Sequence, residues 1–221
     1  MRLALAVFTD GRDECLAETL ESANQNLRAT WFSKTIFDDT GDIDHVKHLK
    51  RQFPDFDVLA TGPGKQGFAG AIASAWRTLF ASEATHVFHL EDDFILEAPI
   101  FVSEMVHVLD LAPNVQQVAL KRQPWGAEPS GGFMTQWPTA YMNQAVEKLR
   151  WTEQRLFFTT NPSVYRRDLM ARGWPEVPQS EQAFSQDLFA ENEHFRCAFY
   201  GHKDDAPLVH HVGANRVGNG Y

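Results

Sequence analysis

Short apolar runs alternate with stretches of helical periodicity along the first half of the chain. The runs, at residues 3–8, 30–37, 57–62, 85–90 and 115–120, have the length and composition of strands. Between them, apolar residues recur every three or four positions, as they do along one face of a helix. The order that this pattern predicts, β-α-β-α-β-α-β-α-β, is that of an α/β protein with an open, mainly parallel sheet and helices on both faces.

The second half of the chain has a less regular pattern. Residues 122–138 are rich in Gly, Pro and Trp, which is typical of a long functional loop. Residues 180–188 again have helical periodicity. No repeat, low-complexity tract or linker interrupts the sequence, so we expect residues 1–221 to fold as a single domain.

Composition narrows the class of protein. A hydrophobic fraction of 43% over 221 residues is enough for one core, and no apolar run approaches the roughly 20 residues of a membrane helix. The first apolar run is too short for a signal peptide, and the 2 cysteines do not form a C-x-x-C pair. These features predict a cytoplasmic protein without membrane contact, disulfide bond or zinc site.

The net charge of -9 is concentrated in the first half of the chain. Residues 1–110 contain 9 Lys and Arg against 18 Asp and Glu, whereas residues 111–221 contain 11 of each kind. This acidity disfavours a general nucleic-acid binder, but the neutral second half leaves room for one basic face.

Three consecutive carboxylates, Glu91, Asp92 and Asp93, follow the fourth apolar run. Ligands of open α/β sheets bind beyond the carboxyl ends of the strands, and carboxylate oxygens suit a hard cation. Residues i and i+2 of an extended chain share a face, so Glu91 and Asp93 would face a metal and Asp92 a sugar hydroxyl. A solvated acidic turn, or an ion pair between Glu91 and an arginine, would explain the same three residues.

Two polar turns follow the second and third runs. Asp38 could accept a hydrogen bond from a base N–H or a ribose hydroxyl, although a plain Asp-Gly turn has the same sequence. The Gly-rich segment 62–70 lacks the P-loop and Rossmann patterns. Its Gly67 nevertheless precedes a predicted helix, whose N-terminus could hold a diphosphate.

The C-terminal part adds two adjacent histidines and an acidic helix start. His210 and His211 would point in opposite directions in an extended segment, and either could ligate a metal through neutral imidazole. Glu181 could face a cleft as a general base, with Asp187 as the alternative. Surface or core histidines, and an acid that simply stabilises a helix N-terminus, are the plainer explanations.

Together the motifs resemble those of nucleotide-sugar glycosyltransferases of the GT-A fold, close to the family-2 type. The matching segments are the first strand and nucleotide-binding turn at 8–12, the second acidic turn at 36–42, the helix over the nucleotide at 67–76 and the metal motif at 89–94. The resemblance implies a single GT-A-like domain in which residues 1–120 bind the nucleotide sugar and residues 121–221 bind the acceptor.

The resemblance also implies roles for individual residues. The donor-binding residues would be Thr9, Asp10, Arg12, Asp38, Gly67 and Asp92, and the metal ligands would be Glu91, Asp93 and His211. Mn²⁺ or Mg²⁺ would bridge Asp93 and the donor diphosphate. Glu181 would deprotonate the acceptor hydroxyl, in a transfer from a UDP-sugar that inverts the anomeric centre.

The sequence departs from the family pattern at two points. Glu91 stands where the family has the first Asp of its metal motif, which puts the role of Glu91 in question. No Q-x-x-R-W segment occurs, which disfavours a processive polysaccharide synthase. A nucleotidyltransferase and an inactive nucleotide-sugar-binding module are the alternatives from other functional classes.

For the acceptor, the chain resembles the compact glycosyltransferases with which bacteriophages modify hydroxymethylated bases in their DNA. This resemblance implies duplex DNA containing 5-hydroxymethylcytosine as acceptor, and the host cytoplasm as location. Basic groups would contact phosphates and an aromatic would fill the gap left by an extruded base; the residues are Lys121, Arg122, Trp125, Arg166 and Arg167. An ordinary solvated face, with a saccharide, protein or small-molecule acceptor, is the alternative.

Overall fold

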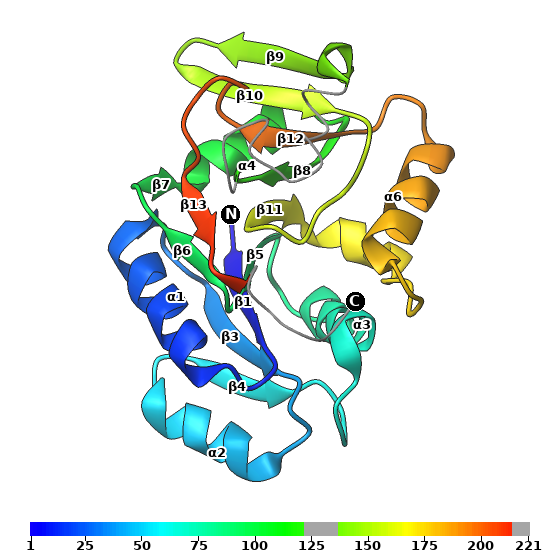
Figure 1. The fold of residues 1–221 in the computed structure, drawn as a ribbon. Coiled ribbons are helices and arrows are strands. Elements are labelled where there is room, and N and C mark those ends of the chain that lie inside the picture. Colours follow the sequence, from blue (N-terminus) through cyan, green and yellow to red (C-terminus); the bar gives the residue numbers. More distant parts are fainter. Residues whose placement is uncertain (122–136, 214–221) are drawn as a thin grey trace.

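The computed structural model describes residues 1–121 and 137–213 (Figure 1). Strands and helices alternate in the first half. The strands are β1 (Leu3–Thr9), β2 (Leu27–Arg28), β3 (Ser33–Asp38), β4 (Asp57–Ala60), β5 (His86–Glu91), β6 (Phe94–Leu96), β7 (Ile100–Phe101) and β8 (Val115–Ala119). The helices are α1 (Asp13–Asn26), α2 (Ile43–Gln52), α3 (Gly67–Phe80) and α4 (Val102–Leu111).

The described part of the second half contains more strand than helix. Its strands are β9 (Tyr141–Val146), β10 (Leu149–Gln154), β11 (Ser163–Arg166), β12 (Arg196–Tyr200) and β13 (Val209–His211). Its helical segments are η1 (Pro138–Ala140), η2 (Arg167–Arg172) and α6 (Ser180–Glu191), of which the first two are short 3-10 helices.

One nine-stranded sheet, in the order β4-β3-β1-β5-β11-β8-β12-β10-β9, forms the centre of the molecule. Strands β4, β3, β1 and β5 are parallel neighbours, and β8 is parallel to β12. Strand β11 runs antiparallel between β5 and β8, and β10 runs antiparallel between β12 and β9. The predicted mainly parallel α/β sheet is confirmed, with β10 and β11 running against the other strands.

The alternating side chains of β1 divide the core into two layers. The odd-numbered residues from Leu3 to Val7 pack with α1, α2 and α4, and the even-numbered residues from Ala4 to Phe8 pack with α3, η2 and α6. Burying a large apolar side chain in such a layer contributes about 1.5–3 kcal/mol. Helices therefore cover both faces of the sheet, as predicted (Figure 1).

The sequence pattern did not indicate the hairpin of β9 and β10. Its two-residue turn is Glu147-Lys148, and Glu147 adopts a positive φ of 53° without the Gly or Asn that marks most such turns. The strands β11 and β13, of 4 and 3 residues, are too short for alternation to be recognised.

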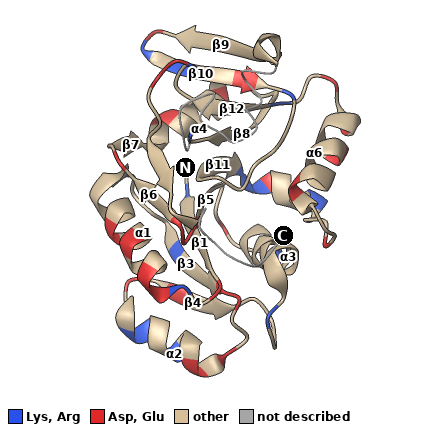
Figure 2. Ribbon diagram, viewed as in Figure 1, with Lys and Arg blue, Asp and Glu red and all other residues tan. Residues whose placement is uncertain are grey.

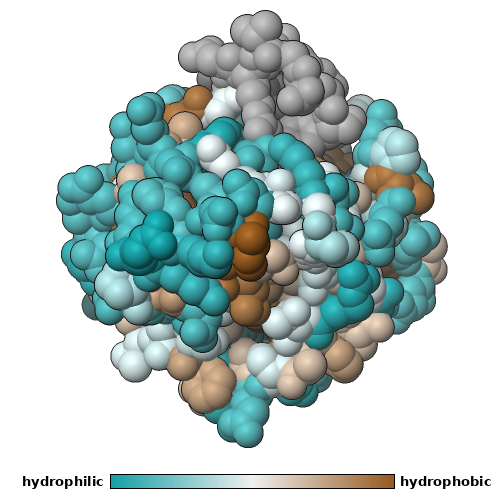
Figure 3. All heavy atoms as spheres, turned by 90° about the horizontal axis from the view of Figure 1, so that it is seen from below, coloured by the Kyte–Doolittle hydropathy of each residue, from teal (hydrophilic) through white to brown (hydrophobic). Residues whose placement is uncertain are grey.

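The surface is mainly polar and acidic on the side of α1. In Figure 2, Asp and Glu side chains gather along this helix. The face in Figure 3 is largely hydrophilic and has a narrow hydrophobic strip near its centre. Among the described helices, none combines the length and hydropathy that crossing a bilayer requires.

Candidate active site

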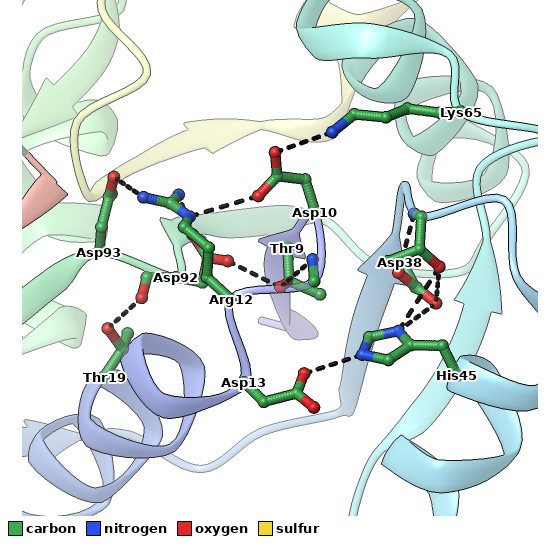
Figure 4. Close-up of polar contacts among 12 residues, drawn as sticks. Thr9, Asp10, Arg12, Asp13, Thr19, Asp38, His45, Lys65, Asp92 and Asp93 are labelled. Carbon is green, nitrogen blue, oxygen red and sulfur yellow. Dashed lines mark hydrogen bonds and ion pairs between the residues drawn. The ribbon is translucent and has the colours of Figure 1, made fainter. Parts of the chain in front are cut away.

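The site lies at the carboxyl ends of three neighbouring parallel strands. Strand β1 pairs with β3 so that Thr9 lies opposite Asp38, and with β5 so that Phe8 lies opposite Glu91. The backbone N–H of Asp92 donates to the carbonyl oxygen of Phe8 at 3.0 Å. The Thr9 hydroxyl donates to Oδ2 of Asp92 at 2.7 Å, which joins residues 83 positions apart in sequence (Figure 4).

The Arg12 guanidinium binds both aspartates of the turn after β5 (Figure 4). Its Nη1 lies 2.6 Å from Oδ2 of Asp93, its Nη2 pairs with Oδ1 of Asp92, and its Nε lies 3.3 Å from Oδ1 of Asp10. Burial lowers the pKa of Arg12, but the carboxylates outweigh burial and raise it, so the guanidinium stays charged. Asp92 and Asp93 therefore face the same cation. Glu91 and Asp93 had been expected to share a face, with Asp92 pointing elsewhere. This expectation was wrong, because β5 ends at Glu91 and the chain turns there.

The C-terminal strand brings a histidine to Asp93. Strand β13 pairs with β6, and Nε2 of His211 lies 3.3 Å from Oδ2 of Asp93. The His211 ring stacks on Phe94 with centroids 4.8 Å apart, and the N–H of Val212 donates to the Asp93 carbonyl at 2.9 Å. His210 is exposed on the same strand. Of the two adjacent histidines, His211 is the one that reaches the acidic turn.

Asp93 and His211 could ligate a divalent cation, and substrate oxygens would complete its coordination shell. Oδ1 of Asp93 is buried and has no hydrogen-bond partner among the described residues. Burial raises the pKa of Asp93, but hydrogen bonds with His211 and Arg12 outweigh it, and the pKa lies below its usual value. Within residues 1–121 and 137–213, no group of three or more His, Cys, Asp or Glu could hold a metal. Mg²⁺ is commonly held by one or two protein carboxylates together with substrate phosphates, and Asp93 would supply one such carboxylate.

Glu91 belongs to a second cluster, with Glu181 of α6. Oε1 of Glu181 accepts hydrogen bonds from the backbone N–H of Thr160 at 2.6 Å and from its hydroxyl at 2.9 Å. Burial raises the pKa of Glu181, Thr160 opposes this, and the charge of Glu91 raises it further. Oε1 of Glu91 faces Nε2 of His89 at 3.6 Å. Asp187, the alternative base, is exposed on another side of α6.

The Asp38 carboxylate is fully engaged inside the protein. Oδ1 accepts the N–H of Thr40 at 3.0 Å, and Oδ2 accepts the Thr40 hydroxyl at 3.0 Å and lies 2.9 Å from Nδ1 of His45 (Figure 4). The other ring nitrogen of His45 lies 2.8 Å from Oδ1 of Asp13. Asp38 is only 1% exposed. The structure gives this carboxylate internal partners, where direct contact with a donor had been expected.

Asp39 occupies the helix N-terminus that was expected to hold a diphosphate. Its two carboxylate oxygens accept the N–H groups of Gln66 and Gly67, each at 2.8 Å, and Oδ1 also accepts the Thr61 hydroxyl at 2.5 Å. An acid at this position also suits the helix dipole of α3. The Gly67 N–H is therefore bound to Asp39 and does not point at a donor phosphate.

The basic residues expected to contact an acceptor bind backbone carbonyls instead. Lys121 is buried, and its Nζ donates to the carbonyls of His202, at 2.5 Å, and of Asp205. Arg166 donates to the carbonyls of Val115 and Leu109.

Arg167 donates to the Ser82 carbonyl at 3.1 Å and lies over the Phe80 ring. Arg166 pairs with His86 at the amino end of β5, so Arg166 and Arg167 lie at the sheet edge opposite the acidic turn. The structure gives both side chains internal backbone partners, and the expectation that they contact DNA stays a prediction. The two other expected contacts, Arg122 and Trp125, lie outside the described residues.

Four side chains of the site were not identified from sequence. His45 is hydrogen-bonded to Asp38, and Thr160 donates to Glu181. Lys65 lies 3.2 Å from Asp10. His89 faces Glu91. His89 had a usable signal, because it stands two residues before Glu91 on one strand and shares its face. The others depend on contacts between distant segments.

No protein-family model and no curated protein matches the sequence. Among solved structures, a mannosyltransferase from Pyrobaculum calidifontis in complex with GDP-Man and Mn²⁺ has a TM-score of 0.66 at 15% identity, covering 98% of this chain and 58% of that one. GalNAc-T7 with UDP, GalNAc and Mn²⁺ has a TM-score of 0.68 at 9% identity, covering 96% and 44%.

Residues 1–349 of S. aureus TarS have a TM-score of 0.62 at 14% identity, covering 96% of this chain and 61% of that one. The chain thus spans less than two thirds of each of these structures. All three are glycosyltransferases of the GT-A type. The chain therefore has the fold of GT-A glycosyltransferases.

Proposed function

We propose that the protein is a glycosyltransferase that moves a sugar from a nucleotide sugar to an acceptor hydroxyl, assisted by Mn²⁺ or Mg²⁺. The observation that carries the proposal is the meeting of Asp93 and His211 beside Arg12, at the carboxyl ends of β1 and β5. In open α/β sheets this is where ligands bind. The solved structures that share the fold contain GDP-Man or UDP with Mn²⁺, which supports the same ligand classes here.

Asp93 and His211 would hold the cation, and Glu91 is turned toward His89. Burial, and then the charge of Asp93, raise the pKa of Glu91 to about 7. When bound, the cation supplies positive charge against the leaving nucleoside diphosphate. The Arg12 guanidinium adds a fixed positive charge on the same side, because three carboxylates keep it protonated and in place. The Thr9 hydroxyl orients Asp92, which binds Arg12 in turn.

Glu181 is the proposed general base. Both of its hydrogen bonds from Thr160 end on Oε1, which leaves Oε2 to accept the proton of an acceptor hydroxyl. The pKa of Glu181 is raised toward neutral pH. A general base is most effective when its pKa lies near the pH at which the enzyme works. A single base is sufficient for a transfer that inverts the anomeric centre, and we propose inversion on that ground.

A UDP-sugar is the proposed donor, because TarS and GalNAc-T7 are described with UDP or a UDP-sugar. The acceptor is proposed only as a hydroxyl compound. Hydroxymethylated DNA has no support among the described basic residues, since Lys121, Arg166 and Arg167 bind backbone carbonyls. A saccharide, a protein or a small molecule is therefore the proposed class of acceptor.

The test is release of nucleoside diphosphate from a panel of UDP- and GDP-sugars in the presence of Mn²⁺. Each donor is incubated alone, with mono- and disaccharides, and with duplex DNA containing 5-hydroxymethylcytosine. We expect at least one UDP-sugar to be consumed, faster with one acceptor class than alone. Failure to bind or consume any nucleotide sugar would contradict the proposal, and consumption only with a GDP-sugar would correct the donor.

A further inference from the structure

A buried chain of polar side chains runs from α3 through β11 to β5. Nε1 of Trp76 lies 3.2 Å from the hydroxyl of Tyr165, and that hydroxyl lies 3.3 Å from Nδ1 of His89. Exposure is 1% for Trp76, 1% for Tyr165 and 2% for His89. None of the three has a role in the mechanism above, yet the chain ends beside Glu91.

The direction of the hydrogen bonds follows from which groups can donate. An indole nitrogen only donates, so Trp76 donates to the Tyr165 oxygen. Burial raises the pKa of Tyr165, so the phenol keeps its proton and donates it to Nδ1 of His89. A ring that accepts a hydrogen bond at Nδ1 carries its proton on the other nitrogen, and that nitrogen faces an acceptor, Oε1 of Glu91. That proton is therefore on Nε2.

The Nε2–H group points at the acidic cluster. The His89 ring stacks on Phe8, with centroids 4.3 Å apart and an interplanar angle of 21°, and the bond from Tyr165 fixes its rotation. Nε2 of His89 and Oε1 of Glu91 are 3.6 Å apart. Both atoms are buried, and neither has a hydrogen-bond partner among the described residues. An unpartnered buried donor and an unpartnered buried acceptor thus face each other.

We propose that His89 is a positioning residue. In the substrate-bound state its Nε2–H donates to the Glu91 carboxylate and fixes the orientation of this carboxylate between Asp93 and Glu181. This inference rests on the proposed function for its kinetic consequence. Shortening the 3.6 Å separation to about 2.9 Å would make an ordinary hydrogen bond. Such contacts commonly tighten only when substrate is bound.

The first arm of the test does not depend on activity. In protein labelled with ¹⁵N-histidine, we expect the His89 ring to have a protonated Nε2 and an unprotonated Nδ1, in the presence of UDP and Mn²⁺. We expect the Nε2–H proton to move downfield on binding, and this movement to be absent in Glu91→Gln. Tyr165→Phe should release the preference for one tautomer. A ring protonated on Nδ1, or an Nε2–H signal unaffected by Glu91→Gln, would overturn the inference.

The second arm compares kinetics of two substitutions at the same position. His89→Phe keeps a flat ring against Phe8 but has no donor, and we expect kcat to fall about 10- to 100-fold with the donor KM within about twofold. His89→Gln keeps a side-chain N–H and should recover most of the loss. His194→Phe, on an exposed histidine with 77% exposure, is the control and should match wild type.

The outcomes separate this inference from the proposed function. Wild-type kcat in His89→Phe, or equal losses in His89→Phe and His89→Gln, would overturn the positioning role. If wild-type protein consumes no nucleotide sugar, the proposed function fails. In that case the ¹⁵N measurement of the His89 tautomer, and its comparison with Glu91→Gln, still tests whether His89 donates a hydrogen bond to Glu91. If His89→Phe does not fold, Tyr165→Phe tests the same chain, with the expected loss in kcat.

Discussion

At the scale of single residues, Arg12 supplies the counter-charge that the acidic turn needs. Asp92 and Asp93 are 1% and 2% exposed, and adjacent buried carboxylates without a counter-ion would be strongly unfavourable. Arg12 binds both, and His211 approaches Asp93 from the other strand pair. A divalent cation at Asp93 would share this carboxylate with the guanidinium, so donor binding and the arrangement of Arg12 should be coupled.

Glu181→Gln tests the proposed base. The amide keeps the shape of the side chain and can still accept the hydrogen bonds from Thr160, but it cannot take a proton. We expect donor affinity to be unchanged and the transfer rate to fall roughly 10²- to 10⁴-fold. Titration of UDP and single-turnover transfer measure the two quantities. A normal rate in Glu181→Gln together with a loss in Asp187→Asn would move the role to Asp187.

Gly213→Ala tests how closely the C-terminal segment must approach the acidic turn. A Cβ at Gly213 would lie 2.1 Å from Oδ2 of Asp93, so the backbone or the carboxylate would have to move. Displacing a catalytic group by about 1 Å costs on the order of 10²-fold in rate, and we expect a loss of that size.

Gly64→Ala is the matched control for this substitution, because its Cβ would meet nothing within 4 Å and its backbone is unstrained. Equal turnover in Gly213→Ala and Gly64→Ala would show that the C-terminal segment does not contribute to the site. Thermal unfolding of both variants checks that the fold is retained.

At the scale of elements, His45 joins two helices to the sheet. It lies on α2, and its ring nitrogens meet Asp38 on β3 and Asp13 on α1, with His48 of α2 also near Asp13. Burial lowers the pKa of His45, but the hydrogen bonds with Asp38 and Asp13 outweigh it, and the pKa is raised above 6.5. The His45 ring therefore links the elements that carry the second acidic turn.

The stability of the protein should depend on pH through His45. Because the folded-state pKa is raised, the contribution is fully present below the unfolded-state pKa and is lost as pH rises through the folded-state pKa. We expect the free energy of unfolding by urea to fall by about 1 kcal/mol more in wild type than in His45→Gln between acidic and alkaline pH.

His107→Gln, at an exposed position on α4, is the control for the pH dependence and should keep the wild-type slope. An identical slope in wild type and His45→Gln would contradict the assignment of the charge to His45. Comparing differences between variants removes the contribution of the other titrating groups.

The pattern predicted β1, β3, β4, β5 and β8 and the helices between them, because the apolar runs at 3–8, 30–37, 57–62, 85–90 and 115–120 stand out between stretches of helical periodicity. The sheet order could not be predicted, since β11 has only 4 residues and enters between β5 and β8 from a distant part of the chain. The acidic turn was found from sequence because it directly follows a buried strand. The internal roles of Asp38, Asp39 and Lys121 were missed, because their partners come from other segments.

At the scale of the whole molecule, the parallel order of β3, β1 and β5 places three polar turns at one edge of the sheet. The antiparallel strand pair β6 and β13 then returns the C-terminal part to that edge. The two core layers hold these elements from opposite faces. The described fold thus assembles one site from segments near both ends of the chain.

The metal dependence of donor turnover tests the central claim most directly. The measurement is the rate of nucleoside diphosphate release from a nucleotide sugar, with Mn²⁺ and with excess EDTA, for wild type, Asp93→Asn and Asp168→Asn. Asp168 is 83% exposed at the far edge of the sheet, so Asp168→Asn controls for loss of a negative charge.

We predict that wild type and Asp168→Asn lose turnover in EDTA and regain it with Mn²⁺, and that Asp93→Asn is inactive at every Mn²⁺ concentration while still folded. Undiminished turnover in EDTA, or wild-type turnover in Asp93→Asn, would contradict the account.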